Sequence, residues 1–196
     1  MTQFTRYKIR TALVIIAASG ALYQFTIKHE SVGPVADTRT GLIASAEMRK
    51  KFMDFVSAVD QLHTKAYRDQ GGVWTICYGT TVYPDGRRVA AEDSATKPEC
   101  MEWLGRHFET RVFPELSRCI NPDLDLTLGE AIAYASFTYN TGKYCGTGLA
   151  RAVNAGDCEA VAREMLRWHY VGKKPSPGLI LRRKAEIALL RCRAKS

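Results

Sequence analysis

The chain has 196 residues, 46% of them hydrophobic, and a formal net charge of +8. This length suits one domain with a sizeable core and an extension. The basic charge favours a polyanionic partner, but much of it lies near the two ends of the chain and could equally form a solvated basic face. No recognisable nucleic-acid-binding module accompanies it, so we expect no nucleic-acid partner.

The extension is an uncharged segment at residues 11–27, closed by Lys28. Basic residues before an apolar segment place the N-terminus in the cytoplasm; here they are Arg6, Lys8 and Arg10. The segment is short for a membrane span and is diluted by Ala, Ser and Gly, which predicts a weak hold on the membrane. A cleaved signal peptide, with Ser19-Gly20-Ala21 as its cleavage site, and an uncleaved anchor both fit, and we favour the anchor.

Four regions are therefore expected. Residues 1–10 form a basic cytoplasmic N-terminus, 11–27 a signal anchor, 28–45 a linker, and 46–196 the folded domain. The linker assignment rests on a mixture of Gly, Pro, Thr, Ser and both charge signs without periodicity.

The domain begins with an amphipathic helix. Its apolar residues recur every three or four positions and end close to Asp60; they are Met48, Phe52, Phe55, Val56, Val59 and Leu62. A Gly71-Gly72 turn then leads to a strand at 73–78, and a Pro84-Asp85-Gly86 turn separates 81–83 from 87–89. These segments predict a small antiparallel sheet.

Helices dominate the rest of the chain. Capping boxes at Thr96 to Glu99 and Thr127 to Glu130 each predict a helix start, and Asn140-Thr-Gly142 ends the second of these helices. Further helices are expected at about 146–154, 157–170 and 178–192. The predicted fold class is α+β, with a small sheet lobe and a larger helical lobe.

All six cysteines lie after the apolar segment. An even number favours disulfides in an oxidising compartment, although buried thiols or a metal site are alternatives. No CxxC pair is present, so we expect no metal. Sequence does not fix the pairing; guessing from neighbouring elements, we expect Cys77 with Cys100, Cys145 with Cys158, and Cys119 with Cys192.

The segment from Asp60 to Thr75 holds the candidate chemistry. Asp60 follows the first helix, Asp69 precedes the Gly-Gly turn, and Thr75 lies on the strand. Two carboxylates that face one another across a cleft are what glycoside hydrolysis requires. Aspartates near turns more often serve as caps or solvated surface groups, and spacing alone favours that plainer interpretation.

Residues 65–69 and 72–79 resemble the active-site segment of phage-type lysozymes, glycoside hydrolase family 24. The resemblance continues through 133–142, 149–156 and 178–186, and covers about residues 46–192. That family carries Glu, then Asp nine residues on, then Thr six residues further. Asp69 and Thr75 match, while Asp60 stands where the family has Glu and Thr80 where it has His.

The resemblance implies a lysozyme-like α+β fold whose two lobes are joined by a long helix. It implies a monomeric muramidase without cofactors, which cleaves the β-1,4 bond between N-acetylmuramic acid and N-acetylglucosamine in peptidoglycan. Asp60 would donate a proton to the leaving oxygen, and Asp69 with Thr75 would position the attacking water. The family pairs an arginine of the last helical region with a site carboxylate, which here could be Arg182 or Arg183, although both also fit a basic helix face. Independently of the resemblance, Tyr139 and Asn140 could line the cleft and bind substrate or simply terminate the central helix.

The weak apolar segment is similar to those of signal-anchor-release endolysins. This implies a phage or prophage lysis enzyme that is held in the host inner membrane and then enters the periplasm.

Asp60 is shorter than Glu by roughly 1.5 Å, and misplacement by about 1 Å can cost on the order of a hundredfold in rate. We therefore expect reduced activity; the alternative is a catalytically silent peptidoglycan-binding or scaffold protein.

Overall fold

The computed structural model describes residues 11–18, 21–28 and 45–191. The predicted cytoplasmic segment 1–10 and most of the predicted linker lie outside this part. The first described elements are β1 (Thr11–Ala18) and β2 (Ala21–Lys28), which pair as antiparallel strands. Within the described residues, no helix has the length and apolar character that a membrane span needs. The signal anchor at 11–27 stays a prediction.

Helix α2 (Ala46–Val59) opens the domain as predicted. It begins where the Ser45 side chain accepts a hydrogen bond from the Met48 amide at 3.0 Å, a typical N-cap. Its apolar face is buried, and its last turn ends at Asp60, whose backbone is extended (φ −103°, ψ 133°). Asp60 is therefore the residue at which the chain leaves the helix.

The small lobe contains the antiparallel strands β3 (His63–Arg68) and β4 (Trp74–Cys77). Strand β4 was predicted, but β3 was not, because its polar and partly exposed sequence shows no regular alternation. The strands expected at 81–83 and 87–89 are reduced to a single bridge between Val82 and Arg88. The sheet of this lobe is therefore smaller than predicted and uses a different partner strand.

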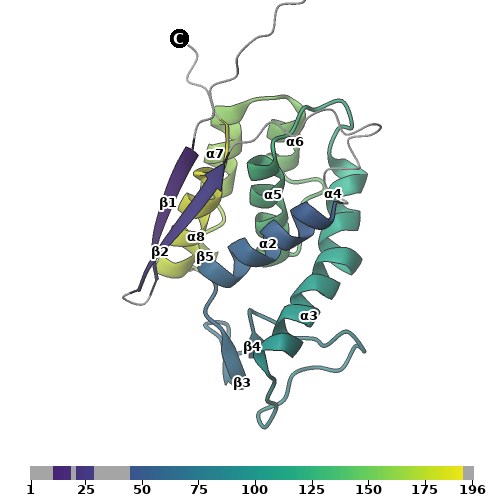
Figure 1. Cartoon of the computed structure of the whole chain (residues 1–196), viewed down its shortest axis with the longest axis vertical. Coiled ribbons are helices and arrows are strands. Elements are labelled where there is room, and N and C mark those ends of the chain that lie inside the picture. Colours follow the sequence, from purple (N-terminus) through teal and green to yellow (C-terminus); the bar gives the residue numbers. More distant parts are fainter. Residues whose placement is uncertain (1–10, 19–20, 29–44, 192–196) are drawn as a thin grey trace, which may run out of the picture.

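A long helical segment joins the lobes (Figure 1). It consists of α3 (Lys97–His107), one π-helical stretch η1 (Phe108–Val112) and α4 (Phe113–Cys119), which follow one another directly. Both hydrogen bonds of the predicted capping box between Thr96 and Glu99 are present. The long connecting helix is thus found where the first capping box places its start.

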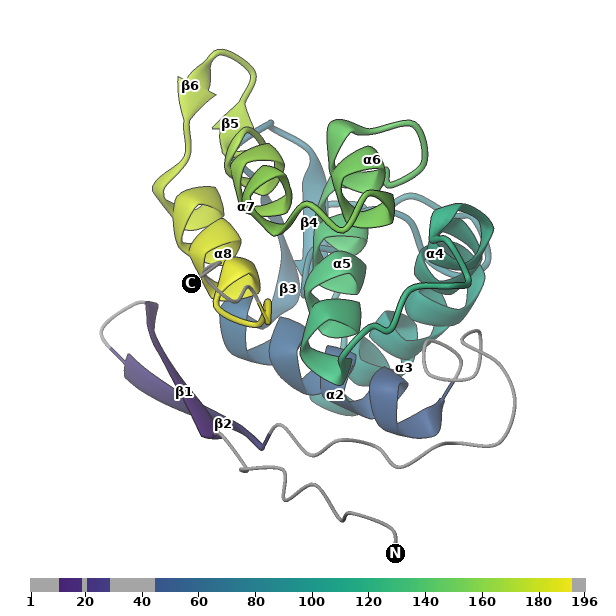
Figure 2. The same ribbon diagram turned by 90° about the horizontal axis from the view of Figure 1, so that it is seen from above.

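The large lobe is built around α5 (Leu128–Thr141), which is buried over most of its length. Figure 2 shows α5 in the middle, with α2, α4 and α8 around it, and these helices all contact it. The second predicted capping box, Thr127 with Glu130, starts α5, and Gly142 ends it in the left-handed conformation (φ 69°). The predicted start and stop of the central helix are both confirmed.

The last part of the large lobe is more broken than predicted. It contains α6 (Gly148–Asn154), α7 (Cys158–Leu166), β5 (Tyr170–Val171), β6 (Lys174–Pro175) and α8 (Pro177–Ile187). The helix expected at 157–170 ends at Leu166, because residues 170–175 form a two-stranded hairpin. The helix expected at 178–192 ends at Ile187.

For two disulfides, both cysteines lie within the described residues. Cys77 pairs with Cys100, as expected, and joins β4 to α3. Cys119 pairs with Cys145, so the expected pairs Cys145–Cys158 and Cys119–Cys192 are wrong. Cys158 is disulfide-bonded as well, and Cys192 lies outside the described residues.

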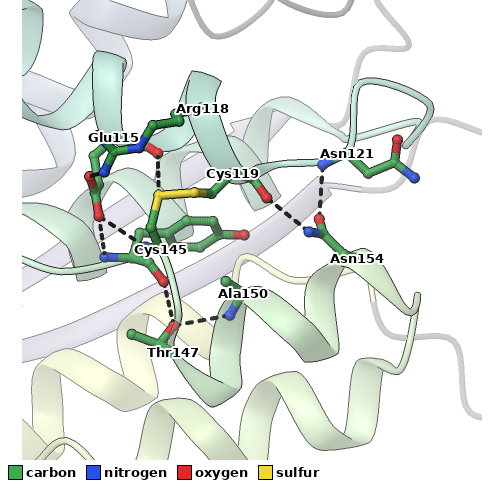
Figure 3. Close-up of a disulfide and its surroundings, with 9 residues drawn as sticks. Glu115, Arg118, Cys119, Asn121, Cys145, Thr147, Ala150 and Asn154 are labelled. Carbon is green, nitrogen blue, oxygen red and sulfur yellow. Dashed lines mark hydrogen bonds and ion pairs between the residues drawn. A yellow bond between two sulfur atoms is a disulfide. The ribbon is translucent and has the colours of Figure 1, made fainter.

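Packing explains the second disulfide. The Glu115 carboxylate on α4 accepts hydrogen bonds from the amides of Tyr144 and Cys145, at 3.2 and 2.9 Å. The Asn154 side chain donates to the carbonyl of Cys119 at 2.8 Å (Figure 3). The end of α4 is thereby held beside the loop after α5, a tertiary contact that cysteine spacing alone does not reveal.

Candidate active site

Asp60 lies at the junction of the two lobes and is bound by an arginine of the last helix. Both carboxylate oxygens of Asp60 accept hydrogen bonds from Nη1 of Arg182 on α8. The Asp60 side chain is 24% exposed, whereas that of Arg182 is only 4% exposed. Of the two arginines considered from sequence, Arg182 is thus the partner of the site carboxylate.

Asp69 occupies the turn between β3 and β4. Its Oδ1 accepts hydrogen bonds from the amides of Gly71 and Val73, at 2.9 and 2.8 Å. This is an aspartate turn of the kind that the plainer interpretation anticipated. Because only Oδ1 takes part in these two bonds, the turn fixes the orientation of the carboxyl group and leaves its second oxygen directed elsewhere.

Thr75 is connected to the same turn. It is 3% exposed, and its hydroxyl donates to the carbonyl of Val73 at 3.0 Å. The backbone of Val73 therefore bonds Asp69 through its amide and Thr75 through its carbonyl. The carboxyl and the hydroxyl that the family resemblance pairs are held by a single residue between them.

Tyr67 was not predicted as a site residue. It lies opposite Thr75 in the β3–β4 register, and its ring is 3.9 Å from that of His63. Burial raises the pKa of Tyr67, and so do the nearby negative charges of Asp69 and Asp60. The charges of both carboxylates thus act on Tyr67, so Asp60 and Asp69 both lie near its side chain. Sequence reasoning missed it because β3 itself was missed.

Tyr139 and Asn140, the predicted substrate-binding residues, lie at the end of α5. The Tyr139 hydroxyl donates to the carbonyl of Tyr78 in the small lobe at 2.8 Å. Burial raises the pKa of Tyr139, and the charge of Asp60 raises it further, so this ring lies beside the candidate acid. Asn140 is exposed and accepts a hydrogen bond from Arg183 at 3.0 Å. Their contact with substrate stays a prediction.

Beneath Asp60 lies a cluster of buried charges. Glu186 on α8 is 0% exposed and forms ion pairs with Arg182 at 3.2 Å and Arg183 at 2.8 Å. Burial lowers the pKa of Arg182, but the negative charges of Asp60 and Glu186 outweigh this and raise it. Glu186 had no role in the sequence analysis, since a glutamate in a basic helix does not show whether it is buried.

Two other kinds of site, a surface cavity and a metal site, do not involve the predicted site residues. A cavity of about 520 Å³ lies on the small lobe near Tyr83 and Trp103, and none of the predicted site residues lines it. In the described part of the chain, no group of three or more His, Cys, Asp or Glu side chains is placed to hold a metal ion. The arrangement around Asp60 and Asp69 is thus the one that brings the predicted chemistry together.

Comparison with known proteins identifies the group to which this arrangement belongs. Residues 57–186 match the Phage lysozyme family. The chain belongs to this family. The matched range contains Asp60, Asp69, Thr75 and Arg182, so it covers the whole candidate site.

Relatives and solved structures agree. The chain is 33% identical over 124 residues to the SAR-endolysin of Enterobacteria phage PA-2, covering 61% of this chain and 70% of the phage protein. It is 32% identical over 131 residues to the "Probable prophage lysozyme" of Escherichia coli (strain K12), covering 65% and 71%. The solved endolysin from Escherichia coli O157:H7 phage FAHEc1 matches with a TM-score of 0.62 and 29% identity, covering 71% of this chain and 90% of that chain. The predicted lysozyme-like α+β fold and the predicted enzyme class, a muramidase, are confirmed.

Proposed function

We propose that this phage lysozyme cleaves the β-1,4 bond between N-acetylmuramic acid and N-acetylglucosamine of peptidoglycan with Asp60 as general acid. Asp69 and Thr75 position the attacking water. The observation that supports this proposal is the position of Asp60, which ends α2 against Arg182, together with Tyr67, whose pKa is raised by burial and by the charges of both Asp69 and Asp60.

The contact with Arg182 gives the acid step a physical basis. Asp60 begins the step protonated and becomes a carboxylate as it gives its proton to the glycosidic oxygen. The guanidinium of Arg182 always carries its charge and is already in place against both oxygens of Asp60. It therefore binds the developing carboxylate more strongly than the neutral acid, which is the condition for lowering the barrier.

Asp69 and Thr75 serve the opposite side of the sugar. An inverting glycosidase needs a second carboxylate that activates a water, at a separation that leaves room for that water. Both groups are fixed through Val73, at 2.8 Å from its amide to Asp69 and 3.0 Å from its carbonyl to Thr75. A water held between them would therefore have a defined position before the substrate binds.

The shorter acid side chain distinguishes this chain from the family pattern. Asp60 is held by the buried Arg182, so its reach into the cleft is limited by both its length and its partner. Displacement of an acid by about 1 Å can cost on the order of a hundredfold in rate. We infer an activity below that of an Asp60→Glu variant.

Clearing of outer-membrane-permeabilised cells tests native activity. The natural chain is expected to reduce the turbidity, and the Asp60→Glu variant to reduce it faster. No clearing by the natural chain, together with clearing by Asp60→Glu, would reject native activity and leave the silent binding or scaffold protein. That alternative is favoured only by the Asp at position 60, and it requires sugar-chain binding without new reducing ends.

We also propose that residues 11–27 hold the chain in the host inner membrane before it enters the periplasm as a monomer. The absence of charge in this segment, the basic residues before it and the SAR-endolysin relatives support this. Membrane fractions of expressing cells are expected to retain the chain, and a Val14→Arg variant to lose it. Equal retention of both would reject the anchor.

A further inference from the structure

Glu186 is a buried charge that the mechanism described above does not use. Its Oε1 accepts hydrogen bonds from the Ser136 hydroxyl at 2.6 Å, Arg183 Nη2 at 2.9 Å and Arg182 Nε at 3.2 Å. Its Oε2 lies 2.8 Å from Arg183 Nε. The arginine nitrogens among these partners can only donate, so their contacts favour an ionised carboxylate, whereas burial raises the pKa of Glu186.

Arg182 stands between this carboxylate and the candidate acid. Its Nε faces Glu186, its Nη1 faces Asp60, and its Nη2 donates to the hydroxyl and carbonyl of Ser136, at 3.0 and 3.3 Å. All donor nitrogens of the guanidinium are therefore engaged. Glu186 and Ser136 fix the plane of the group, and this plane determines where Nη1 meets Asp60.

The charges are balanced across the same group. Arg182 and Arg183 supply two positive charges, and Glu186 and Asp60 two negative charges. In a buried site, where charges are weakly screened, an arginine with one carboxylate partner binds it more strongly than an arginine shared by two. The hold of Arg182 on the ionised form of Asp60 is thus weakened by Glu186.

We propose that Glu186 is a positioning residue for the acid step, which orients Arg182 and shares its positive charge, so that Arg182 binds Asp60 less tightly than an unshared arginine would. This inference rests on the proposed role of Asp60 as general acid. The other groups whose electrostatics involve Asp60 are Arg183 from α8, Tyr139 from α5 and Tyr67 from β3, and Asp69 also acts on Tyr67. Within the described residues, Arg182 is the charged group bonded directly to Asp60, so a change in Glu186 reaches Asp60 through it.

A structural role would give a different result. If Glu186 only satisfied the buried arginines, its loss would reduce stability and lower the rate by a similar factor at every pH. If it sets the hold of Arg182 on Asp60, its loss also moves the pH at which activity falls. This fall occurs as pH rises, since a general acid must be protonated to act.

The test measures reducing ends released from purified peptidoglycan by the full chain across a range of pH. In Glu186→Gln, the high-pH fall in activity is expected to move about 1 pH unit toward acid. In Glu186→Asp, which keeps the charge, it should move in the same direction by less. Glu115→Gln is the matched control, because the Glu115 carboxylate on α4 accepts hydrogen bonds from the amides of Tyr144 and Cys145 and forms its ion pair with Arg118. The pH profile of this variant should not move.

An unmoved fall in a folded Glu186→Gln variant overturns the proposal, whatever its rate. If circular dichroism shows that Glu186→Gln does not fold, an unmoved fall in Glu186→Asp overturns it. Asp60→Asn separates this inference from the proposed function. If Asp60→Asn keeps the natural activity, the acid assignment fails; if it is inactive and the fall is unmoved in the Glu186 variants, only the role of Glu186 fails.

Discussion

At the residue scale, two single residues, Val73 and Arg182, connect the functional groups of the site. Val73 joins Asp69 to Thr75 through its own amide and carbonyl. Arg182 joins Asp60 to the buried Glu186. Both links use groups with fixed geometry, a peptide unit in one case and a planar guanidinium in the other, so the two halves of the site are held before substrate binds.

Replacement of Thr75 tests the proposed water position. Thr75→Val keeps the buried shape and removes the hydroxyl, and we expect the rate of reducing-end release to fall about a hundredfold because the water loses one of its two partners. Thr75→Ser keeps the hydroxyl and should retain most of the activity. A Thr75→Val variant as active as the natural chain would show that Thr75 is only a buried strand residue.

For the site, the sequence offers three candidate residues and leaves two arginines open as the carboxylate's partner, and it does not indicate their neighbours. Asp60, Asp69 and Thr75 were found through the resemblance of their segment to a known family, which needs no knowledge of packing. Tyr67 and Glu186 matter because of what lies beside them across the fold. Neither Tyr67 nor Glu186 belongs to a local sequence pattern that indicates which residues it contacts, so their roles are seen only in the folded chain.

At the element scale, helix ends were predictable wherever their signals are local. Both capping boxes and the Gly142 stop depend on residues within one turn, and all three are found. Strand β3 and the β5–β6 hairpin depend on partner strands, and the Cys119–Cys145 disulfide depends on α4 lying beside the loop after α5. These features were missed, because a short stretch of sequence does not show which distant strand or cysteine will lie beside it in the fold.

The contact between the start of α5 and the residues just after α8 can be tested with two glycines that occupy equivalent helix positions. Gly129 is the second residue of α5, and a Cβ there would lie 2.6 Å from the carbonyl oxygen of Leu189. Gly178 is the second residue of α8, where the nearest atom would be 3.9 Å away. Gly129→Ala should therefore lower the free energy of unfolding by about 1–3 kcal/mol.

Gly178→Ala is the control and should leave stability unchanged or raise it by up to about 1 kcal/mol, since alanine loses less backbone entropy on folding. Denaturant unfolding followed by circular dichroism measures both. If both substitutions change the free energy of unfolding equally, the start of α5 does not approach the Leu189 carbonyl as closely as the structure shows.

At the scale of the whole molecule, two lobes are joined by the long helical segment and by contacts across the site. The Tyr139 hydroxyl connects α5 to the small lobe, and the Asp60–Arg182 pair connects the end of α2 to α8. At the other end of the large lobe, Glu115 ties α4 to the loop that carries Cys145.

Acid pH should weaken the Glu115 contact. Burial raises the pKa of Glu115, but hydrogen bonds from the Cys145 and Tyr144 amides, with Arg118 nearby, outweigh it and lower the pKa below 4.5. A carboxyl whose pKa is lower in the folded state stabilises the fold above its unfolded value and loses this contribution as pH falls. The difference in Tm between the natural chain and Glu115→Gln should therefore be present at pH 7 and shrink as pH falls below 4.5. A difference that stays the same from pH 7 down to acid pH would contradict this.

The central claim is that Asp60 is the general acid of this phage lysozyme. Release of reducing ends from purified peptidoglycan by the natural full chain and by Asp60→Asn, at equal concentration and with the fold of both checked by circular dichroism, tests it most directly. We predict measurable release by the natural chain and at least about a hundredfold less by Asp60→Asn. Equal release by the two proteins would contradict the account.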